Sequence, residues 1–148
     1  MAISQAMCTL FKKDLLLGDH HLDTDDIRIA LYTSSASLGA TTDGYTTSNE
    51  ITNASGSAYT AGGLQLTSVA VTEDSTSGVF DAADPEWTSA SFTANGALIY
   101  NKTLGDASSN ARGAIAVLAF GGDFTVSGGT FKIVFPAATA SNAIVRID

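Results

Sequence analysis

The sequence is poor in the residues that build several kinds of functional site. It holds one cysteine, Cys8, so an internal disulfide framework is excluded. Only 15% of its residues are charged, well below the usual quarter, and only two residues are proline. No apolar run approaches the roughly 18 residues that a membrane-spanning helix needs. We therefore expect a chain that is held together by packing and that does not span a membrane.

Basic residues are also scarce. Seven of them stand against 15 acidic residues, which gives a net charge of −8, and Lys12–Lys13 is the one basic pair. Binding to nucleic acid depends on clustered Lys and Arg, so the sequence excludes nucleic acid and anionic membranes as partners. The opening residues 1–5 lack the positive start and apolar core of a signal peptide, which predicts synthesis in a cytoplasm.

Small hydroxyl residues and hydrophobic residues dominate what is present. Ser and Thr occupy 34 of the 148 positions, glycine occupies 14, and 45% of the chain is hydrophobic. This mixture is typical of many strands joined by short turns and unlike a charged helical bundle. The length suits a single domain over residues 1–148.

One stretch near the N-terminus has helical periodicity. Residues 3–17 repeat apolar side chains at helical spacing, with Ser4 as the expected N-cap and Gly18 as the residue after the helix. More apolar surface is present than a single stripe requires, so this helix must lie against its own domain or against a neighbour. The apolar positions are Ile3, Met7, Leu10, Phe11 and the leucines at 15–17.

The first predicted strand and a long loop follow the helix. Residues 27–32 alternate apolar and polar side chains, which predicts a strand. Residues 33–58 have the composition of a loop, with Leu38, Tyr45 and Ile51 as its main apolar anchors. Loops of this length inside a domain are uncommon and tend to be functional or mobile.

The rest of the chain predicts closely spaced strands. Asn95-Gly96 is the strongest hairpin signal, and a two-residue turn there would place Phe92 opposite Ile99. With the first strand, the chain has about eight strands, which predicts a mainly β fold: an antiparallel β-sandwich or barrel with one N-terminal α-helix. The later strands are expected at 64–71, 78–82, 87–94, 97–101, 112–120, 130–135 and 143–147.

One cluster of residue types resembles a metal site. His20-His21 precedes three aspartates, but adjacent histidines on a loop point apart and the run lacks the glycine and glutamate of a calcium loop. We interpret it as a solvated connector, with a weak divalent-cation site as the alternative, and expect no tightly bound metal. The aspartates are Asp23, Asp25 and Asp26.

No arrangement in the sequence predicts catalysis. The chain has no G-x-S-x-G motif, and the carboxylates at 81, 84 and 86 flank a proline in an expected turn. Cys8 is expected to be a buried apolar side chain, because no histidine is placed to activate it. We therefore expect neither an enzyme nor a cofactor. Four aromatic residues are expected to pack in the core or in an interface, with stacking on sugar rings as the alternative: Tyr45, Tyr59, Trp87 and Tyr100.

Several blocks along the chain carry a resemblance to a known family. They are the opening residues 1–8 with Phe11-Lys12-Lys13-Asp14-Leu15, then residues 29–33, 59–63 and 96–101, and the ending Ala143-Ile144-Val145-Arg146-Ile147. In this order, and over nearly the whole chain, the sequence resembles a family of small virion structural proteins of tailed bacteriophages. Members of such families are head decoration (cement) proteins or tail and fibre components.

The resemblance implies a structural protein of the virion, made in the host cytoplasm, with no catalytic residues. We expect a capsid decoration protein that stabilises the head shell, with the major capsid protein, other virion proteins and copies of itself as partners. A tail or tail-fibre module remains an alternative, as does a carbohydrate-binding β-sandwich on the virion surface.

The N-terminal helix and the long loop are the expected contacts between chains. An apolar helix left free would form an exposed patch, and spaced anchors in a polar loop are suited to ordering on a neighbour. The residues expected to make inter-subunit contacts are Ile3, Met7, Leu10, Phe11, Leu38, Tyr45 and Ile51.

Overall fold

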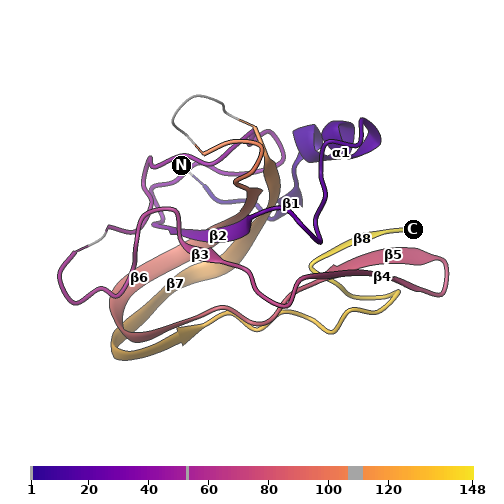
Figure 1. Cartoon of the computed structure of the whole chain (residues 1–148). Coiled ribbons are helices and arrows are strands. Elements are labelled where there is room, and N and C mark those ends of the chain that lie inside the picture. Colours follow the sequence, from indigo (N-terminus) through magenta and orange to yellow (C-terminus); the bar gives the residue numbers. More distant parts are fainter. Residues whose placement is uncertain (1, 53, 107–111) are drawn as a thin grey trace.

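The chain folds into two antiparallel sheets that share one hydrophobic core (Figure 1). The structure is a computed structural model, and it describes residues 2–52, 54–106 and 112–148. The main sheet has the strand order β1-β7-β6-β2-β3, and the small sheet has the order β4-β5-β8. The predicted mainly β fold of eight strands with an N-terminal helix is confirmed, and the sheets are not closed into a barrel.

The elements run in a simple order along the chain. Strands β2, β5 and β8 lie where local alternation predicted them, whereas the strand expected at 64–71 is divided into β3 and β4. Their bounds are β1 (Ala6–Met7), α1 (Thr9–Leu16), β2 (Ile27–Tyr32), β3 (Leu64–Gln65), β4 (Ala70–Asp74), β5 (Ser77–Asp81), β6 (Glu86–Asn101), β7 (Ala114–Lys132) and β8 (Val145–Ile147).

The two longest strands, β6 and β7, form a ribbon that bends sharply at the lower left of Figure 1. Its pairing runs from Tyr100↔Ala114 to Glu86↔Lys132, with several register shifts on the way. At the main shift, Ala94 pairs with Phe124 and Gly96 pairs with Ala119. One residue of β6 between these pairs therefore lies opposite four residues of β7. The extra residues on β7 form a bulge that includes Gly121-Gly122, and such bulges bend a strand.

The predicted hairpin at Asn95-Gly96 is wrong, because β6 continues through both residues. Phe92 pairs with Val126 and Ile99 pairs with Ala116, so the two expected partners lie on one strand. Gly96 is needed for a different reason: a Cβ there would lie 2.7 Å from the carbonyl oxygen of Leu118. The glycine therefore permits a close approach within the ribbon.

The helix is shorter than predicted. It spans Thr9–Leu16 with Cys8 as its N-cap, and Gly18, at φ +77°, follows it as expected. The backbone N–H of Ser4 instead donates to the carbonyl of Leu38 at 2.8 Å, and Ala6–Met7 pairs with β7. These long-range hydrogen bonds satisfy the backbone that a longer helix would have satisfied locally, so the expected N-cap at Ser4 is wrong.

Residues 33–58 form an irregular segment, as predicted, with isolated bridges and no strand among the residues described there. Its three apolar anchors are packed within their own chain. Leu38, Tyr45 and Ile51 are all buried in the core. A contact of this segment with another subunit stays a prediction.

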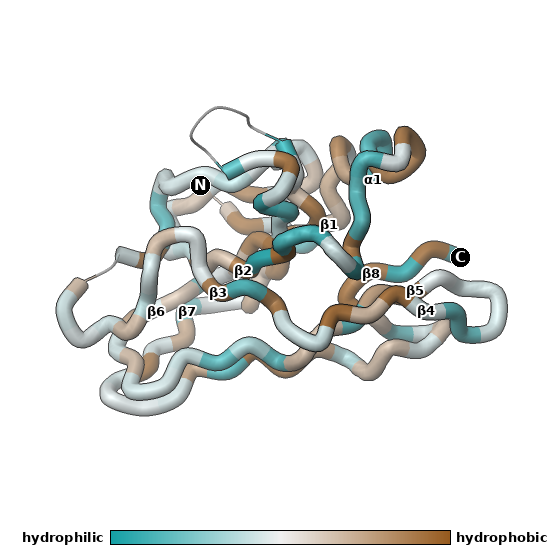
Figure 2. The backbone as a smooth tube through the Cα atoms, viewed as in Figure 1, coloured by the Kyte–Doolittle hydropathy of each residue, from teal (hydrophilic) through white to brown (hydrophobic). Residues whose placement is uncertain are grey.

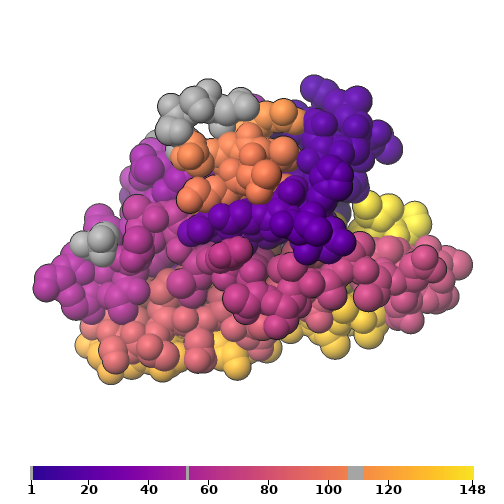
Figure 3. Space-filling model, in the orientation of Figure 1, coloured from indigo at the N-terminus to yellow at the C-terminus, as the bar shows by residue number. Residues whose placement is uncertain are grey.

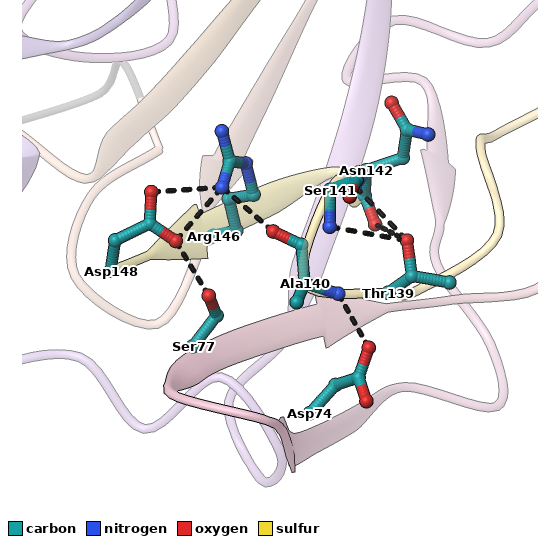
Figure 4. A network of polar contacts seen from close by, with 8 residues as sticks. All are labelled: Asp74, Ser77, Thr139, Ala140, Ser141, Asn142, Arg146 and Asp148. Atoms are coloured by element: carbon teal, nitrogen blue, oxygen red, sulfur yellow. Dashed lines mark hydrogen bonds and ion pairs between the residues drawn. The ribbon is translucent and has the colours of Figure 1, made fainter.

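A polar network ties the C-terminal segment to the small sheet (Figure 4). The Arg146 guanidinium donates to the carbonyl of Ala140 at 2.7 Å and to the Asp148 carboxylate at 2.8 Å. Ser77 on β5 donates to the same carboxylate, and Asp74 on β4 accepts from the backbone N–H of Ala140 at 2.6 Å. These contacts hold the final strand against β5.

Candidate functional site

The acidic cluster with two histidines does not form a metal centre. Asn101 donates to the Asp25 carboxylate at 2.6 Å and lies 3.2 Å from Nδ1 of His20. His20 is buried, whereas His21 is exposed, so the adjacent rings point apart. Within residues 2–52, 54–106 and 112–148 no three His, Cys, Asp or Glu side chains are grouped to hold a metal ion.

His20 is instead a packed core residue. Its ring meets the Phe11 ring edge-on, with 4.8 Å between centroids, and its Nε2 is buried without a hydrogen-bond partner. Burial lowers the pKa of His20, while the nearby carboxylates of Asp14, Asp25 and Asp19 act in the opposite direction and Arg112 adds to the lowering. The site favours the neutral imidazole.

Arg112 joins the helix to the start of β7. Its guanidinium donates to Asp14 at 3.2 Å and to Asp19 at 2.7 Å. The Asp14 side chain is almost completely buried, so its charge needs a partner, and Arg112 supplies it. This ion pair fastens α1 to the main sheet.

A buried carboxylate organises the long loop. Glu50 accepts hydrogen bonds from the hydroxyls of Tyr45 and Tyr59, both at 2.6 Å, and from the backbone N–H of Gly62 at 2.7 Å. The Tyr59 hydroxyl in turn accepts from the backbone N–H of Leu31 on β2 at 3.0 Å. Burial raises the pKa of both tyrosines, and the Glu50 carboxylate raises it further. Glu50 thus links the loop, the Gly62 turn and β2.

The aromatic residues considered for sugar stacking do not form a platform. Tyr45, Tyr59, Trp87 and Tyr100 are all buried, which confirms the core interpretation and leaves no exposed face on them for a sugar ring. Tyr45 stacks on Tyr100 with 4.7 Å between centroids, and Tyr59 packs against Trp87 at 6.2 Å. Their rings pack against one another in the core of the protein.

Two of the residues weighed for catalysis, Asp84 and Cys8, have structural roles. Asp84 accepts from the backbone N–H of Phe135 at 2.9 Å and lies 3.7 Å from the Lys132 ammonium group. Cys8 is fully buried, and burial raises the pKa of its thiol to about 11. A thiol with that pKa is protonated at neutral pH and is a poor nucleophile.

Six of the seven residues expected between subunits lie in or against the chain's own core, and Leu10 is the exception. Phe11, Leu38, Tyr45 and Ile51 are buried, while Ile3, Met7 and Leu10 are partly buried. Those four buried side chains offer no surface to a neighbour in this conformation. The exposed apolar surface of the helix lies elsewhere: Leu16 is 90% exposed and Leu17 is 64% exposed.

One apolar hollow open to solvent lies at the bend of the β6–β7 ribbon. We call it the corner groove, and its volume is about 410 Å³. Phe120 contacts both Phe124 and Phe131, each with 6.1 Å between ring centroids, although Phe120 and Phe131 are far apart along β7. The lining residues are Phe120, Phe124, Thr125, Val126, Thr130, Phe131, Lys132 and Ile133.

The floor of the corner groove is packed against the core, and Phe124 at its edge is exposed. Phe131 packs against Phe92 at 5.1 Å and against buried Trp87 at 6.0 Å, which connects the groove to the core. Phe124 is 53% exposed. A large aromatic side chain held on a packed base and open to solvent is typical of a protein contact.

The outer edge of β7 is open beside the corner groove. Strand β1 pairs with β7 only at Ala116 and Val117, and the side chain of Gln5 accepts from the backbone N–H of Ala119. In the part of the chain that the structure describes, no strand pairs with this edge from Phe120 onward. Open strand edges are places where another chain adds contacts.

The sequence analysis missed the corner groove. The strands expected at 112–120 and 130–135 are parts of one strand, β7, which passes through Gly121-Gly122 and Gly128-Gly129. The sequence did contain a signal for this surface: Phe120, Phe124 and Val126 are an even number of positions apart, so in one continuous strand they lie on the same face. The bulge near Gly128 then shifts the alternation, so that Phe131 and Ile133 continue the same surface.

The comparisons with known proteins add no relative. No family model, no curated protein and no solved structure matches the chain. Among the described residues, no helix is both long enough and apolar enough to cross a membrane. None of these comparisons links the chain to a family.

Proposed function

We propose that this protein is a structural component of a tailed-phage virion that decorates the capsid and stabilises the head shell. The observation that carries the proposal is the corner groove, an apolar surface built on a packed base and left open. A decoration protein has to bind other subunits through such surfaces, and stabilises them because it binds only the assembled form. The resemblance of the sequence blocks supplies the setting.

The buried polar side chains have structural contacts, which supports a binding role for the protein. Glu50, Asp14 and His20 are buried, and the hydrogen bonds or ion pairs of Glu50 and Asp14 hold loops and the helix in place. These groups hold the fold rigid. A rigid fold lowers the entropy cost of binding, because the docking surface does not need to be ordered first.

The long loop favours the head over the tail tube. Stacking of tail-tube rings would require residues 33–58 to reach a neighbouring ring, but Tyr45 and Ile51 are buried against the main sheet and Glu50 fastens the loop to β2 through Tyr59. A loop pinned in this way is poorly suited to reaching across subunits.

Heat release of the packaged genome tests the proposal. Particles that carry the protein are compared with particles that lack it, and with particles offered the Phe124→Asp variant. Loss of an aromatic anchor costs more than about 1 kcal/mol at many interfaces, so the affinity of the variant for the particle should fall by at least about fivefold. Val71→Asp on the small sheet is the matched control, since Val71 is 52% exposed and Phe124 is 53% exposed.

Each outcome separates the alternatives. Particles without the protein should release their genome at a lower temperature, and Val71→Asp should bind as the wild type does. Equal heat resistance with and without the protein would refute the decoration role. Equal heat resistance combined with loss of adsorption to cells would favour the tail or tail-fibre role instead.

A further inference from the structure

We propose that the corner groove receives the exposed end of α1 from a second copy of the chain, so that copies associate head to tail. This inference rests on the proposed function for its setting, a crowded particle surface, and it names the occupant of the groove. The inserted side chains are Leu16 and Leu17, and the receiving side chains are Phe120, Phe124 and Phe131.

The end of α1 has the shape and chemistry of an inserted element. Leu16 and Leu17 are adjacent and largely exposed, and Gly18 ends the helix directly after them. The helix protrudes from the body of the molecule in Figure 3, and its outer turn is coloured hydrophobic in Figure 2. Two neighbouring leucines on a protrusion are an apolar surface that its own chain does not cover.

The corner groove has room for both leucines. Its volume of about 410 Å³ lies within the roughly 300–1,000 Å³ range of pockets that bind small organic ligands. The walls are mostly aromatic and aliphatic, with Thr125 and Thr130 among the polar members and Lys132 the only charged one. An aliphatic occupant therefore fits the lining better than a charged one.

Charge complementarity selects a second copy as the occupant. The chain carries a net charge of −8, so contacts between copies are repulsive unless a basic surface meets an acidic one. The only basic pair, Lys12 and Lys13, is exposed on α1 itself, while Asp14 turns inward to Arg112. The helix end therefore presents positive charge beside its leucines.

The strands around the corner groove carry the opposite charge. Segments 84–95 and 118–135 contain three acidic residues and one basic residue. Glu86 and Asp123 are exposed, and Asp84 lies beside Lys132. Lys132, the only charged residue in the groove lining, is paired with Asp84, so exposed Glu86 and Asp123 leave these strands with a net negative charge. The two lysines of the helix end would meet this charge, which offsets the general repulsion between copies.

The positions of the two surfaces determine the symmetry. In Figure 1, α1 lies at the upper right and the bend of the β6–β7 ribbon at the lower left, so the surfaces are at opposite ends of the molecule. A contact between two different surfaces is heterologous, and repeating it gives a closed ring or an open chain of copies instead of a symmetric pair.

The contact is small, and its strength depends on concentration. One helix end in one groove buries less than the roughly 1,200 Å² of a standard stable interface. We therefore expect the purified protein to be largely monomeric when dilute and to associate near 1 mM, the order of effective concentration that clustering on a surface supplies. On a particle, neighbouring copies would reinforce one another.

Pairwise cross-linking with two single-cysteine variants tests the arrangement. Lys13→Cys and Thr130→Cys keep the leucines and the phenylalanines of the contact, since both replaced residues are exposed beside them. The two proteins are mixed at about 1 mM and treated with a short bismaleimide, which tolerates wider spacing than a disulfide, whose Cα atoms must lie within about 7 Å. Cys8 is fully buried and does not compete. The mixture should give cross-linked dimer at least fivefold above either variant alone, and Leu16→Asp/Leu17→Asp in the Lys13→Cys chain should reduce the yield to that of the single variants.

The outcomes are distinct from those of the particle experiment. Replacing the Thr130→Cys partner with Val71→Cys should bring the yield down to that of the single variants. Equal yields from the mixture and from Thr130→Cys alone would overturn the head-to-tail contact and indicate groove-to-groove pairing. No specific cross-link at about 1 mM, with particle occupancy still lost in Phe124→Asp, would assign the groove to the shell and leave the decoration role standing. A specific cross-link with unaltered particles would support the inference and refute the decoration role.

Discussion

Removal of the Glu50 carboxylate is the sharpest test of how the long loop is held. In Glu50→Ala the hydroxyls of Tyr45 and Tyr59 and the backbone N–H of Gly62 lose their common acceptor. All three donors lie at a buried site that water does not readily reach, because Glu50 is only 7% exposed. The cost is therefore that of leaving buried donors without acceptors.

The magnitude follows from the number and type of these bonds. A hydrogen bond to a charged group contributes about 1.5–3 kcal/mol, and the three are not additive, so we expect a loss of about 4–6 kcal/mol. A domain of this kind is stable by about 5–15 kcal/mol, so the variant should be severely destabilised. Tyr45→Phe removes one donor of the three and should cost about 1–2 kcal/mol.

Urea unfolding followed by tryptophan fluorescence measures these losses. Trp87 is the only tryptophan and is 3% exposed, so its emission reports loss of the core. With a denaturant slope of about 2 kcal/mol per M, Glu50→Ala should lower the urea midpoint by about 2–3 M and Tyr45→Phe by less than 1 M. Glu73→Ala serves as the control, because Glu73 is exposed on β4.

The reasoning fails if Glu50→Ala shifts the midpoint no more than Glu73→Ala does, since exposed substitutions usually change stability by less than about 0.5 kcal/mol. If Glu50→Ala does not fold at all, the smaller Tyr45→Phe effect still tests the network. A Tyr45→Phe variant as stable as the wild type would show that the hydrogen bond from Tyr45 contributes nothing.

Three further outcomes follow from packing and burial. Phe11→Ala should lower stability by about 3–5 kcal/mol in thermal or urea unfolding, because Phe11 is 1% exposed; a change under about 1 kcal/mol would contradict its place in the core. Gly63→Ala should prevent folding or lower the melting temperature sharply, since a Cβ there would lie 1.8 Å from the carbonyl oxygen of Ile29 at φ +74°; a normally folded variant would contradict that close approach. Burial lowers the pKa of His20, so the unfolded chain takes up a proton near pH 6.5 before the folded chain does, and the contribution of His20 to stability is complete above that pH and lost as the pH falls below it. His20→Gln should therefore reduce the fall in urea midpoint between pH 7 and pH 5, whereas exposed His21→Gln should not; equal profiles for the two variants would contradict the sign.

The sequence pattern correctly predicted the strands in which apolar and polar side chains alternate or which are bounded by turns. Residues 27–32 alternate clearly and form β2, and the short strands β5 and β8 lie where turns bounded them. The close spacing of these short strands was sufficient to predict a mainly β fold. The buried state of Trp87 and Tyr59 was also predictable, because isolated large aromatics in a small domain are most often packed inside.

Long-range contacts decided the elements that local patterns misplaced. Residues 3–7 have helical spacing, yet Ser4 bonds to Leu38 and Ala6 pairs with Val117, which no local window contains. Asn95-Gly96 has the composition of a turn, yet Gly96 is required by the nearby carbonyl of Leu118. The corner groove escaped prediction for the same reason, since the bend that brings Phe120 to Phe131 arises from the register of β7 on β6.

The pairing of β1 with β7 has a consequence for synthesis of the chain. Ala6 and Met7 find their partners at Val117 and Ala116, so the main sheet cannot be completed until most of the chain has left the ribosome. Non-local strand pairing of this kind slows folding, and during the wait Phe11 and Leu15 have no sheet to cover them. Production in the cell should therefore be sensitive to temperature and to chaperone supply at the nascent stage, even though the finished fold is tightly packed.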